Sequence, residues 1–202
     1  MGRTIHAASW VVPVDGAPIR DGRVLVEGDR IVWVGSADDP DAPEGTVRDL
    51  GPGVLLPGLV NAHCHLELSH LKGAAPLGQG FVRWVEALVA ARPGFGEDEA
   101  RSAVAAEIAG LRERGTVGVG DISNRLDHVD LLTTSGLAAT AFLEVLAWDP
   151  TRTPETEAWI DERLSAATPN SGERVKVRLA AHAPHSVSPG LLRRLAERED
   201  LG

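Results

Sequence analysis

The sequence predicts an α/β protein in which a short β-rich segment precedes four β–α units. Residues 1–56 contain short runs of alternating apolar and polar residues, separated by turn dipeptides. After residue 57, apolar runs of strand length alternate with segments of helical periodicity. Repeated β–α units of this kind form a parallel sheet with right-handed crossovers.

The N-terminal segment is expected to be part of a small β domain. One strand is predicted at residues 5–12. Strands at 23–27 and 30–34 are predicted to form a hairpin, because Gly28-Asp29 suits the turn between them. The segment has too few strands to enclose a core, so we expect it to pair with strands from elsewhere. Further turns are predicted at Asp15-Gly16, Asp21-Gly22 and Pro52-Gly53.

The first β–α unit begins with an apolar run at residues 54–60, which is expected to lead into a buried strand ending near residue 65. Apolar residues at helical spacing predict a helix at 81–91. A longer, alanine-rich helix is predicted at 97–114, with acidic residues early and arginines late, as the helix dipole favours. Gly115 is expected to end this helix.

The remaining three β–α units follow the same alternation. Gly136 is expected to end one helix, and Thr153, followed by Pro154, is expected to cap the next. Ser188 and Pro189 are expected to open the last helix. The predicted elements are, in order, a strand at 117–121, a helix at 126–135, a strand at 138–146, a helix at 153–167, a strand at 175–181 and a helix at 188–198.

Charge and cysteine content restrict the partners and the compartment. The formal net charge is −9, which argues against nucleic acid or an anionic membrane as a partner, because both attract clustered Lys and Arg. A single cysteine cannot form an internal disulfide, as is typical of a reducing cytoplasm. The chain lacks an apolar run of roughly 20 residues and a signal-peptide pattern at its start. The sequence therefore predicts a cytoplasmic protein.

His63 and His65 form the clearest candidate site. In a strand, residues i and i+2 point to the same face, about 6.6 Å apart. Both imidazoles can therefore approach one metal ion, while Cys64 faces the opposite side and is expected to pack in the core. The alternative is a pair of buried histidines that hydrogen-bond within a core. We favour it less, because two polar rings on one face of a core strand need a shared partner.

Polar residues also follow the other predicted strands. Asp121, Glu144 and His182 lie at or next to the carboxyl ends of their strands. In (β/α)8 barrels, catalytic residues gather at that end. The agreement of four separate strand ends therefore predicts a functional site there.

Four segments of the chain form a recognisable set: GRVLVEGDRIVWVG (22–35), VLLPGLVNAHCHLELS (54–69), GTVGVGDIS (115–123) and HAPHSVSP (182–189). Together they resemble the metal-dependent deaminases and chlorohydrolases of the amidohydrolase superfamily. The LELS and FVRW motifs, at 66–69 and 81–84, look most like the aminodeoxyfutalosine-deaminase-like branch. The resemblance implies that residues 1–56 are the N-terminal portion of a composite β-sandwich. It implies that residues 57–202 are the first half of a (β/α)8 TIM-type barrel.

The resemblance also implies roles for individual residues. His63 and His65 become the first two ligands of one Zn²⁺ or Fe²⁺ ion. Glu67 and His182 become substrate-binding residues, with a solvated carboxylate and a structural histidine as the respective alternatives. His185 either shares this role or helps to open the following helix. A second metal would need a carboxylated lysine where His182 stands, so a single ion is expected.

The family's remaining metal ligands and its proton-shuttling Glu belong to strands five to eight, which are expected beyond Gly202. We therefore expect a truncated chain that is inactive alone and in which no catalytic residue is identified. In the full-length protein, the expected reaction is hydrolytic deamination of an aminated purine-type base or nucleoside by metal-activated water. The alternatives are hydrolysis of chloride or a cyclic amide by the same site, and a non-catalytic half-barrel. The exact substrate and a homo-oligomeric state of the full-length protein stay open.

Other hydrolase classes lack support in the sequence. The zinc cytidine-deaminase fold uses a P-C-x-x-C motif, whereas this chain has one cysteine. Neither H-E-x-x-H nor G-x-S-x-G occurs. The histidine pair therefore remains the strongest chemical signal.

Overall fold

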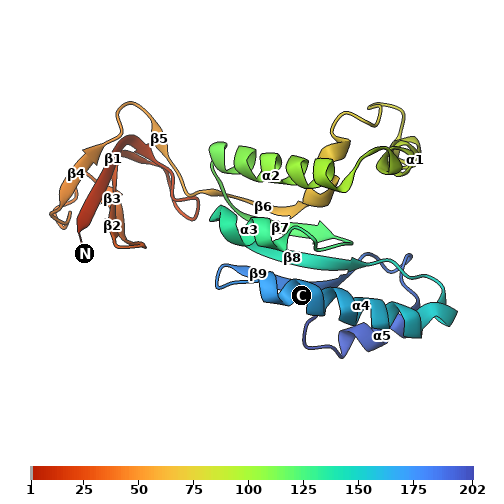
Figure 1. Cartoon of the computed structure of the whole chain (residues 1–202). Helices are drawn as coiled ribbons and strands as arrows, with labels where there is room; N and C mark the ends of the chain where they lie inside the picture. Colours follow the sequence, from red (N-terminus) through yellow and green to blue (C-terminus); the bar gives the residue numbers. More distant parts are fainter. Residues whose placement is uncertain (1) are drawn as a thin grey trace. The chain divides into compact units, whose positions relative to one another are not determined.

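In the computed structural model, which describes residues 2–202, the chain divides into two compact units. One unit ends at Gly58, and the other spans Leu59–Gly202. Figure 1 labels the strands and helices of both units. Within residues 2–202, no helix is long and apolar enough to cross a membrane.

The N-terminal unit is a five-stranded sheet in which β1 is central. The predicted hairpin is confirmed, and Gly28 in its turn has φ 63°, a left-handed conformation that glycine adopts without strain. β2 pairs antiparallel with both β1 and β3, whereas β4 and β5 pair parallel with β1. The strands are β1 (Arg3–Val11), β2 (Ile19–Glu27), β3 (Arg30–Ser36), β4 (Thr46–Asp49) and β5 (Val54–Leu55).

Two predictions for this unit are wrong. Asp21-Gly22 lies inside β2 rather than in a turn, and Gly22 pairs with Ala8. A Cβ on Gly22 would lie 2.6 Å from Val11 Cγ2, so close packing rather than a turn explains this glycine. The apolar run from residue 54 does not continue into the histidine strand, because Val54–Leu55 pairs with β1.

The N-terminal unit has a small core and many exposed apolar side chains. The expectation that strands from elsewhere cover this unit stays a prediction. The buried apolar residues are Ile5, Ala8, Val11, Val24 and Leu25, and the large exposed ones include Ile31, Val32, Val34, Val47, Leu50, Val54 and Leu56.

The C-terminal unit is a four-stranded parallel sheet in the order β6-β7-β8-β9, which confirms the predicted α/β class with a parallel sheet. Consecutive strands are neighbours, and helical segments connect them. The strands are β6 (Leu59–Cys64), β7 (Thr116–Ser123), β8 (Ala138–Val145) and β9 (Val175–Ala181). The helical segments are η1 (Leu66–Leu71), α1 (Phe81–Ala91), η2 (Arg92–Gly94), α2 (Glu97–Glu113), α3 (Val129–Ser135), η3 (Pro150–Arg152), α4 (Thr153–Ala167), η4 (Thr168–Asn170) and α5 (Pro189–Ala196).

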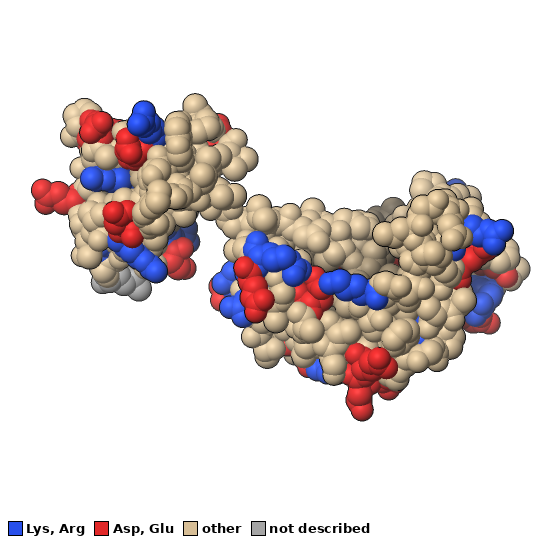
Figure 2. Space-filling model, turned by 90° about the horizontal axis from the view of Figure 1, so that it is seen from above, with Lys and Arg blue, Asp and Glu red and all other residues tan. Residues whose placement is uncertain are grey.

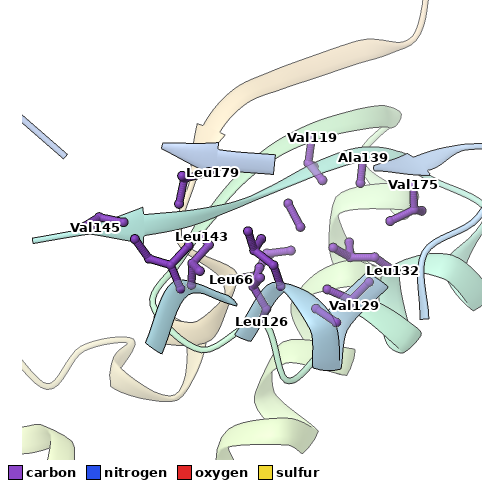
Figure 3. Packing of buried hydrophobic residues seen from close by; sticks show 14 of the residues in the cluster. Leu66, Val119, Leu126, Val129, Leu132, Ala139, Leu143, Val145, Val175 and Leu179 are labelled. Atoms are coloured by element: carbon purple, nitrogen blue, oxygen red, sulfur yellow. The ribbon is translucent and has the colours of Figure 1, made fainter. Parts of the chain in front are cut away.

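The main hydrophobic core lies between this sheet and its helices (Figure 3). Alternate residues of β8, from Ala139 to Val145, face this core, because successive side chains of a strand point to opposite faces. The intervening residues, among them Phe142 and Glu144, therefore belong to the other face. Helix residues such as Leu132, Ile160 and Leu191 fill the core from the covered side.

Several element boundaries differ from the predictions. The helix predicted from residue 126 begins at Val129, because Leu126 has φ 59° and lies in a turn before the helix. Thr153 does not cap α4: the N-cap is Arg152, and the Thr153 hydroxyl donates to Pro150 O at 2.9 Å. Ser188 does cap α5, since its hydroxyl accepts from Leu191 N–H.

β6 is not the buried strand that its apolar sequence predicts. Leu59 and Val60 are 52% and 68% exposed, because β6 is an outer strand of the sheet.

The charged residues of the C-terminal unit are mixed on the face shown in Figure 2, where basic and acidic side chains interleave without a continuous basic surface.

Candidate metal and substrate site at the carboxyl edge of the sheet

Polar residues from all four strands of the C-terminal unit gather along one edge. Parallel strands end on the same side, so the residues at or after their carboxyl ends share that edge. His63 is the penultimate residue of β6 and His65 directly follows that strand, whereas Asp121 lies two residues before the end of β7. Glu144 is near the end of β8, and His182 follows β9 with its N–H bonded to Val145 O at 3.1 Å. The edge thus carries the residues that the sequence singled out.

The histidine pair sits where β6 departs from regular pairing. The register between β6 and β7 shifts between Asn61 and Cys64. A Cβ on Gly120 of β7 would lie 2.4 Å from Ala62 O, so this close approach requires glycine at that position. The irregular strand end leads directly to the two imidazoles.

The two imidazoles lie together but do not stack. Their ring centroids are 5.4 Å apart, with an angle of 70° between the ring planes. His63 is exposed and His65 is half-buried, so the described residues do not bury the two rings as a hydrogen-bonded core pair. Imidazole nitrogens are common ligands of Zn²⁺, and two rings at this spacing present donors on one side of the chain.

Cys64, between the two histidines, packs against the hydrophobic core, and its Sγ lies 3.6 Å from Gly120 O. Burial raises the pKa of the Cys64 thiol to about 12, and the nearby Asp121 and Glu107 carboxylates add to the effect. The thiol therefore stays protonated at neutral pH, and it packs against the hydrophobic core. This agrees with the packing role predicted for Cys64.

The described residues supply two donors for a metal ion, not a complete set. Within residues 2–202, no group of three or more His, Cys, Asp or Glu side chains is placed to hold a metal ion. A catalytic zinc site normally has three protein ligands and one open position. His63 and His65 fit part of such a site by their chemistry and by their proximity.

Glu67 occupies a buried position in η1, directly after the histidine pair. Its Oε2 accepts from the Ser123 hydroxyl at 2.8 Å and from Asn124 N–H at 3.0 Å. Its Oε1 accepts from Arg92 Nη2 at 3.3 Å, and the residue is 8% exposed. Glu67 also lines a cavity of about 440 Å³ together with His70 and Arg92. The predicted substrate-binding role of Glu67 stays a prediction.

Asp121 and His128 form a buried pair that the sequence did not single out. Asp121 Oδ2 lies 2.6 Å from His128 Nε2, and Asp121 Oδ1 accepts from Leu66 N–H at 2.9 Å. Burial acts to lower the pKa of His128, but hydrogen bonds and charges from Asp121 and Asp127 outweigh it and raise this pKa to about 9. The His128 imidazole, whose Nδ1 lies 3.5 Å from Asp127 Oδ1, in turn lowers the pKa of Asp127. A histidine next to an aspartate at 127–128 was the available signal, but it gave no indication of burial.

Glu144 makes a local hydrogen bond at the end of β8. It is 8% exposed, and its Oε2 lies 3.4 Å from Asn124 Nδ2. The same amide nitrogen donates to the Glu144 backbone carbonyl at 3.1 Å. This contact joins the ends of β7 and β8.

His182 and His185 form a second histidine pair, on the turn after β9. Their ring centroids are 6.0 Å apart, and both residues are exposed. His182 Nδ1 lies 2.7 Å from the Ser186 hydroxyl. β6 and β9 are the two outer strands of the sheet, so the two histidine pairs occupy opposite ends of the carboxyl edge.

Comparisons with known proteins give a consistent set of relatives. No family model matches the chain. Its sequence is 31% identical to the 5-methylthioadenosine/S-adenosylhomocysteine deaminase of Moorella thermoacetica, over 98% of this chain and 46% of that protein.

Solved structures with the same fold include the Helicobacter pylori aminofutalosine deaminase in complex with methylthio-coformycin. That match has a TM-score of 0.76 and 29% identity, and it covers 94% of this chain and 46% of the other. The zinc complex of an atrazine chlorohydrolase from Arthrobacter aurescens matches with a TM-score of 0.71 over 96% of this chain and 50% of the other, but at 18% identity it shows the fold alone. The chain spans about half the length of the relatives it matches.

Proposed function

Because its homologues are deaminases of the amidohydrolase superfamily, we propose that this chain forms the N-terminal part of a metal-dependent hydrolytic deaminase. In this proposal, residues 57–202 contribute the first half of a (β/α)8 barrel, and residues 1–56 contribute part of a β-sandwich. The four parallel strands and the partial coverage of the relatives support this assignment.

His63 and His65 would be two ligands of a single Zn²⁺ or Fe²⁺ ion. The observation that carries this assignment is the placement of both imidazoles on one side of the chain at a strand end, 5.4 Å apart. The remaining ligands, and the Glu that moves the proton, would come from sequence outside residues 1–202. When bound, such an ion lowers the pKa of its water from 15.7 towards about 7, which provides a nucleophile at neutral pH.

A single ion also agrees with the residue at the end of β9. A bridging carboxylated lysine would have to stand at that strand end, which His182 occupies. Lys176 lies six residues earlier, about 20 Å back along an extended strand. The strand therefore offers no lysine near the edge where the other candidate residues lie.

The substrate would be an aminated purine-type base or nucleoside of the aminodeoxyfutalosine or methylthioadenosine kind. His182 would hydrogen-bond the substrate through Nε2, because its Nδ1 is held by the Ser186 hydroxyl. His185, exposed on the same turn, and Glu67, behind the metal pair, would provide further contacts. The names of the relatives support this substrate class, since they are deaminases of adenosine-like compounds.

The decisive experiment is His63→Ala in the enzyme that contains this chain. We expect bound zinc and ammonia release to be lost together, because one of the metal ligands is removed. His6→Ala is the matched control, since His6 lies in β1 of the other unit and should leave both unchanged. Full zinc content and turnover in the His63 variant would refute the ligand assignment.

A substrate panel then separates deamination from other hydrolyses. Ammonia release from aminodeoxyfutalosine, methylthioadenosine and adenosine is expected, without chloride release from chlorotriazines or opening of cyclic amides. Residues 1–202 expressed alone with zinc are expected to be inactive. Turnover by a cooperatively melting monomer of these 202 residues would contradict the need for further ligands.

A further inference from the structure

The end of β6 is held in place by side chains rather than by a regular strand ladder. The register between β6 and β7 shifts between Asn61 and Cys64, so the ladder is interrupted where His63 lies. His65 has left the strand and precedes η1, with φ −122° and ψ 82°. The position of the two imidazoles therefore depends on what fixes the chain immediately after them.

A buried carboxylate provides that fixed point. Asp121 Oδ1 accepts from the N–H of Leu66, the residue that follows His65, at 2.9 Å. Asp121 is 0% exposed and Leu66 is 2% exposed, so water does not compete for this hydrogen bond. The bond joins the end of β7 to the first residue of η1.

The Asp121 carboxylate is itself oriented from α3. Its Oδ2 lies 2.6 Å from Nε2 of His128, which is 1% exposed. His128 is the N-cap residue of α3, and its carbonyl accepts from the N–H groups of Leu131 and Leu132. The imidazole is thus fixed at a helix end, and the carboxylate cannot turn away from Leu66 without breaking a buried ion pair.

We infer that Asp121 and His128 are positioning residues that set the spacing of the His63 and His65 imidazoles. This inference rests on the proposed metal-binding role of that pair. Groups behind metal ligands that fix the orientation of those ligands typically contribute 10–100-fold to metal affinity. Here the contact acts through the backbone of Leu66, one residue from His65.

A purely structural role would make different predictions, and a double variant separates the two. Asp121→Val with His128→Leu replaces the buried ion pair by apolar side chains, which removes both charges together and keeps the core filled. It also leaves the buried Leu66 N–H without its acceptor, so the melting temperature is expected to fall moderately. Asp121→Asn is the conservative variant, because its amide oxygen still accepts from Leu66.

The measurement is titration of the metal-free, full-length form of the proposed enzyme with Zn²⁺ alone, followed by calorimetry, with the melting temperature recorded for each variant. The unsubstituted enzyme should bind one ion, and His63→Ala should abolish this binding. The apolar double variant should melt cooperatively but bind Zn²⁺ about 10–100-fold more weakly. Asp121→Asn should restore affinity to within a few fold. Asp130→Asn, which removes the exposed ion pair with Arg101, is the control and should bind normally.

The outcomes distinguish this inference from the proposed function. An unsubstituted full-length enzyme that binds no Zn²⁺, or a His63→Ala variant that binds it normally, would overturn the metal assignment. A chain that binds Zn²⁺ equally well with and without the Asp121–His128 pair would overturn the positioning role alone. If the double variant fails to fold, His128→Gln decides: weaker Zn²⁺ binding at an unchanged melting temperature supports the positioning role, and unchanged binding refutes it.

Discussion

Two pairs of histidines stand at the two ends of the same sheet edge, and they are built differently. The first pair, His63 and His65, follows β6, and the second pair, His182 and His185, follows β9. In both pairs the rings meet edge to face, with centroids 5.4 Å and 6.0 Å apart. The pairs thus look alike when only their rings are compared.

The structures behind the two pairs differ in burial and in charge. Behind the first pair, the Asp121–His128 ion pair and the Glu67 carboxylate make buried hydrogen bonds that tie η1 to β7. Behind the second pair, a single hydroxyl, that of Ser186, contacts an exposed ring. Groups behind metal ligands fix the orientation of those ligands. The buried hydrogen bonds around the first pair therefore support the metal role proposed for it, and the exposed second pair lacks such support.

The largest expected effect is a loss of stability when the buried pair beside the first two histidines is broken. Asp121→Ala should lower the free energy of unfolding by about 3–5 kcal/mol, because it leaves the His128 charge buried without its main partner. Urea denaturation of the 202-residue chain measures this effect. Asp130→Ala, which removes an exposed partner of Arg101, should cost less than about 1 kcal/mol. Equal losses of unfolding free energy in the two variants would show that the buried pair stabilises the fold no more than an exposed ion pair does.

The pH dependence of stability tests the same pair without removing an atom. The pKa of His128 in the folded chain is about 9, against an ordinary value of 6.5, because Asp121 and Asp127 outweigh the effect of burial. Its stabilising contribution is thus fully present below pH 6.5 and is lost as the pH rises through 9, by up to about 3 kcal/mol. Urea midpoints between pH 6 and pH 9.5 should fall accordingly. His128→Gln should flatten this slope, and an unchanged slope in that variant would contradict the assignment.

Features set by neighbouring residues in the sequence could be predicted, whereas contacts between residues far apart in the sequence could not. The bounds of α1 and β9 agree with the prediction, because local periodicity determines where such elements lie. The prediction that β6 is buried was wrong, because an apolar run does not distinguish an outer strand of a sheet from an inner one. The Asp121–His128 contact was missed because a left-handed turn at Leu126 returns the chain towards β7, and no periodic pattern records such a turn.

In the candidate site, too, local spacing could be predicted and long-range contacts could not. Placing His63 and His65 on one side of the chain required only the two-residue period of a strand. The hydrogen bonds of Glu67 with Ser123 and Asn124 join residues more than fifty positions apart. The spacing of nearby residues does not predict partners so far away in the sequence. The sequence therefore identified Glu67 as a candidate but not the residues that hydrogen-bond to it.

Ser123→Ala, near the first histidine pair, should lower the stability of the fold by an intermediate amount. The Ser123 hydroxyl donates to Glu67 and accepts from the N–H groups of Arg125 and Leu126 at 3.1 and 2.9 Å. The residue is 0% exposed, so its removal leaves buried polar groups unpaired and should cost about 1–3 kcal/mol. Thermal unfolding measures the loss. Ser123→Thr, which keeps a hydroxyl, is the control and should recover part of it.

Ser186→Ala should have the smallest effect, at the second pair. The Ser186 hydroxyl contacts an exposed ring, so its loss should lower the free energy of unfolding by about 0.5–1.5 kcal/mol at most. In the proposed full-length enzyme, zinc content should stay unchanged, because His63 and His65 lie at the other end of the edge. The KM for the nucleoside should rise several-fold, because the His182 ring loses the contact that orients it. Loss of zinc in this variant, with KM unchanged, would instead show that the β9 end belongs to the metal site and that the two pairs do not have separate roles.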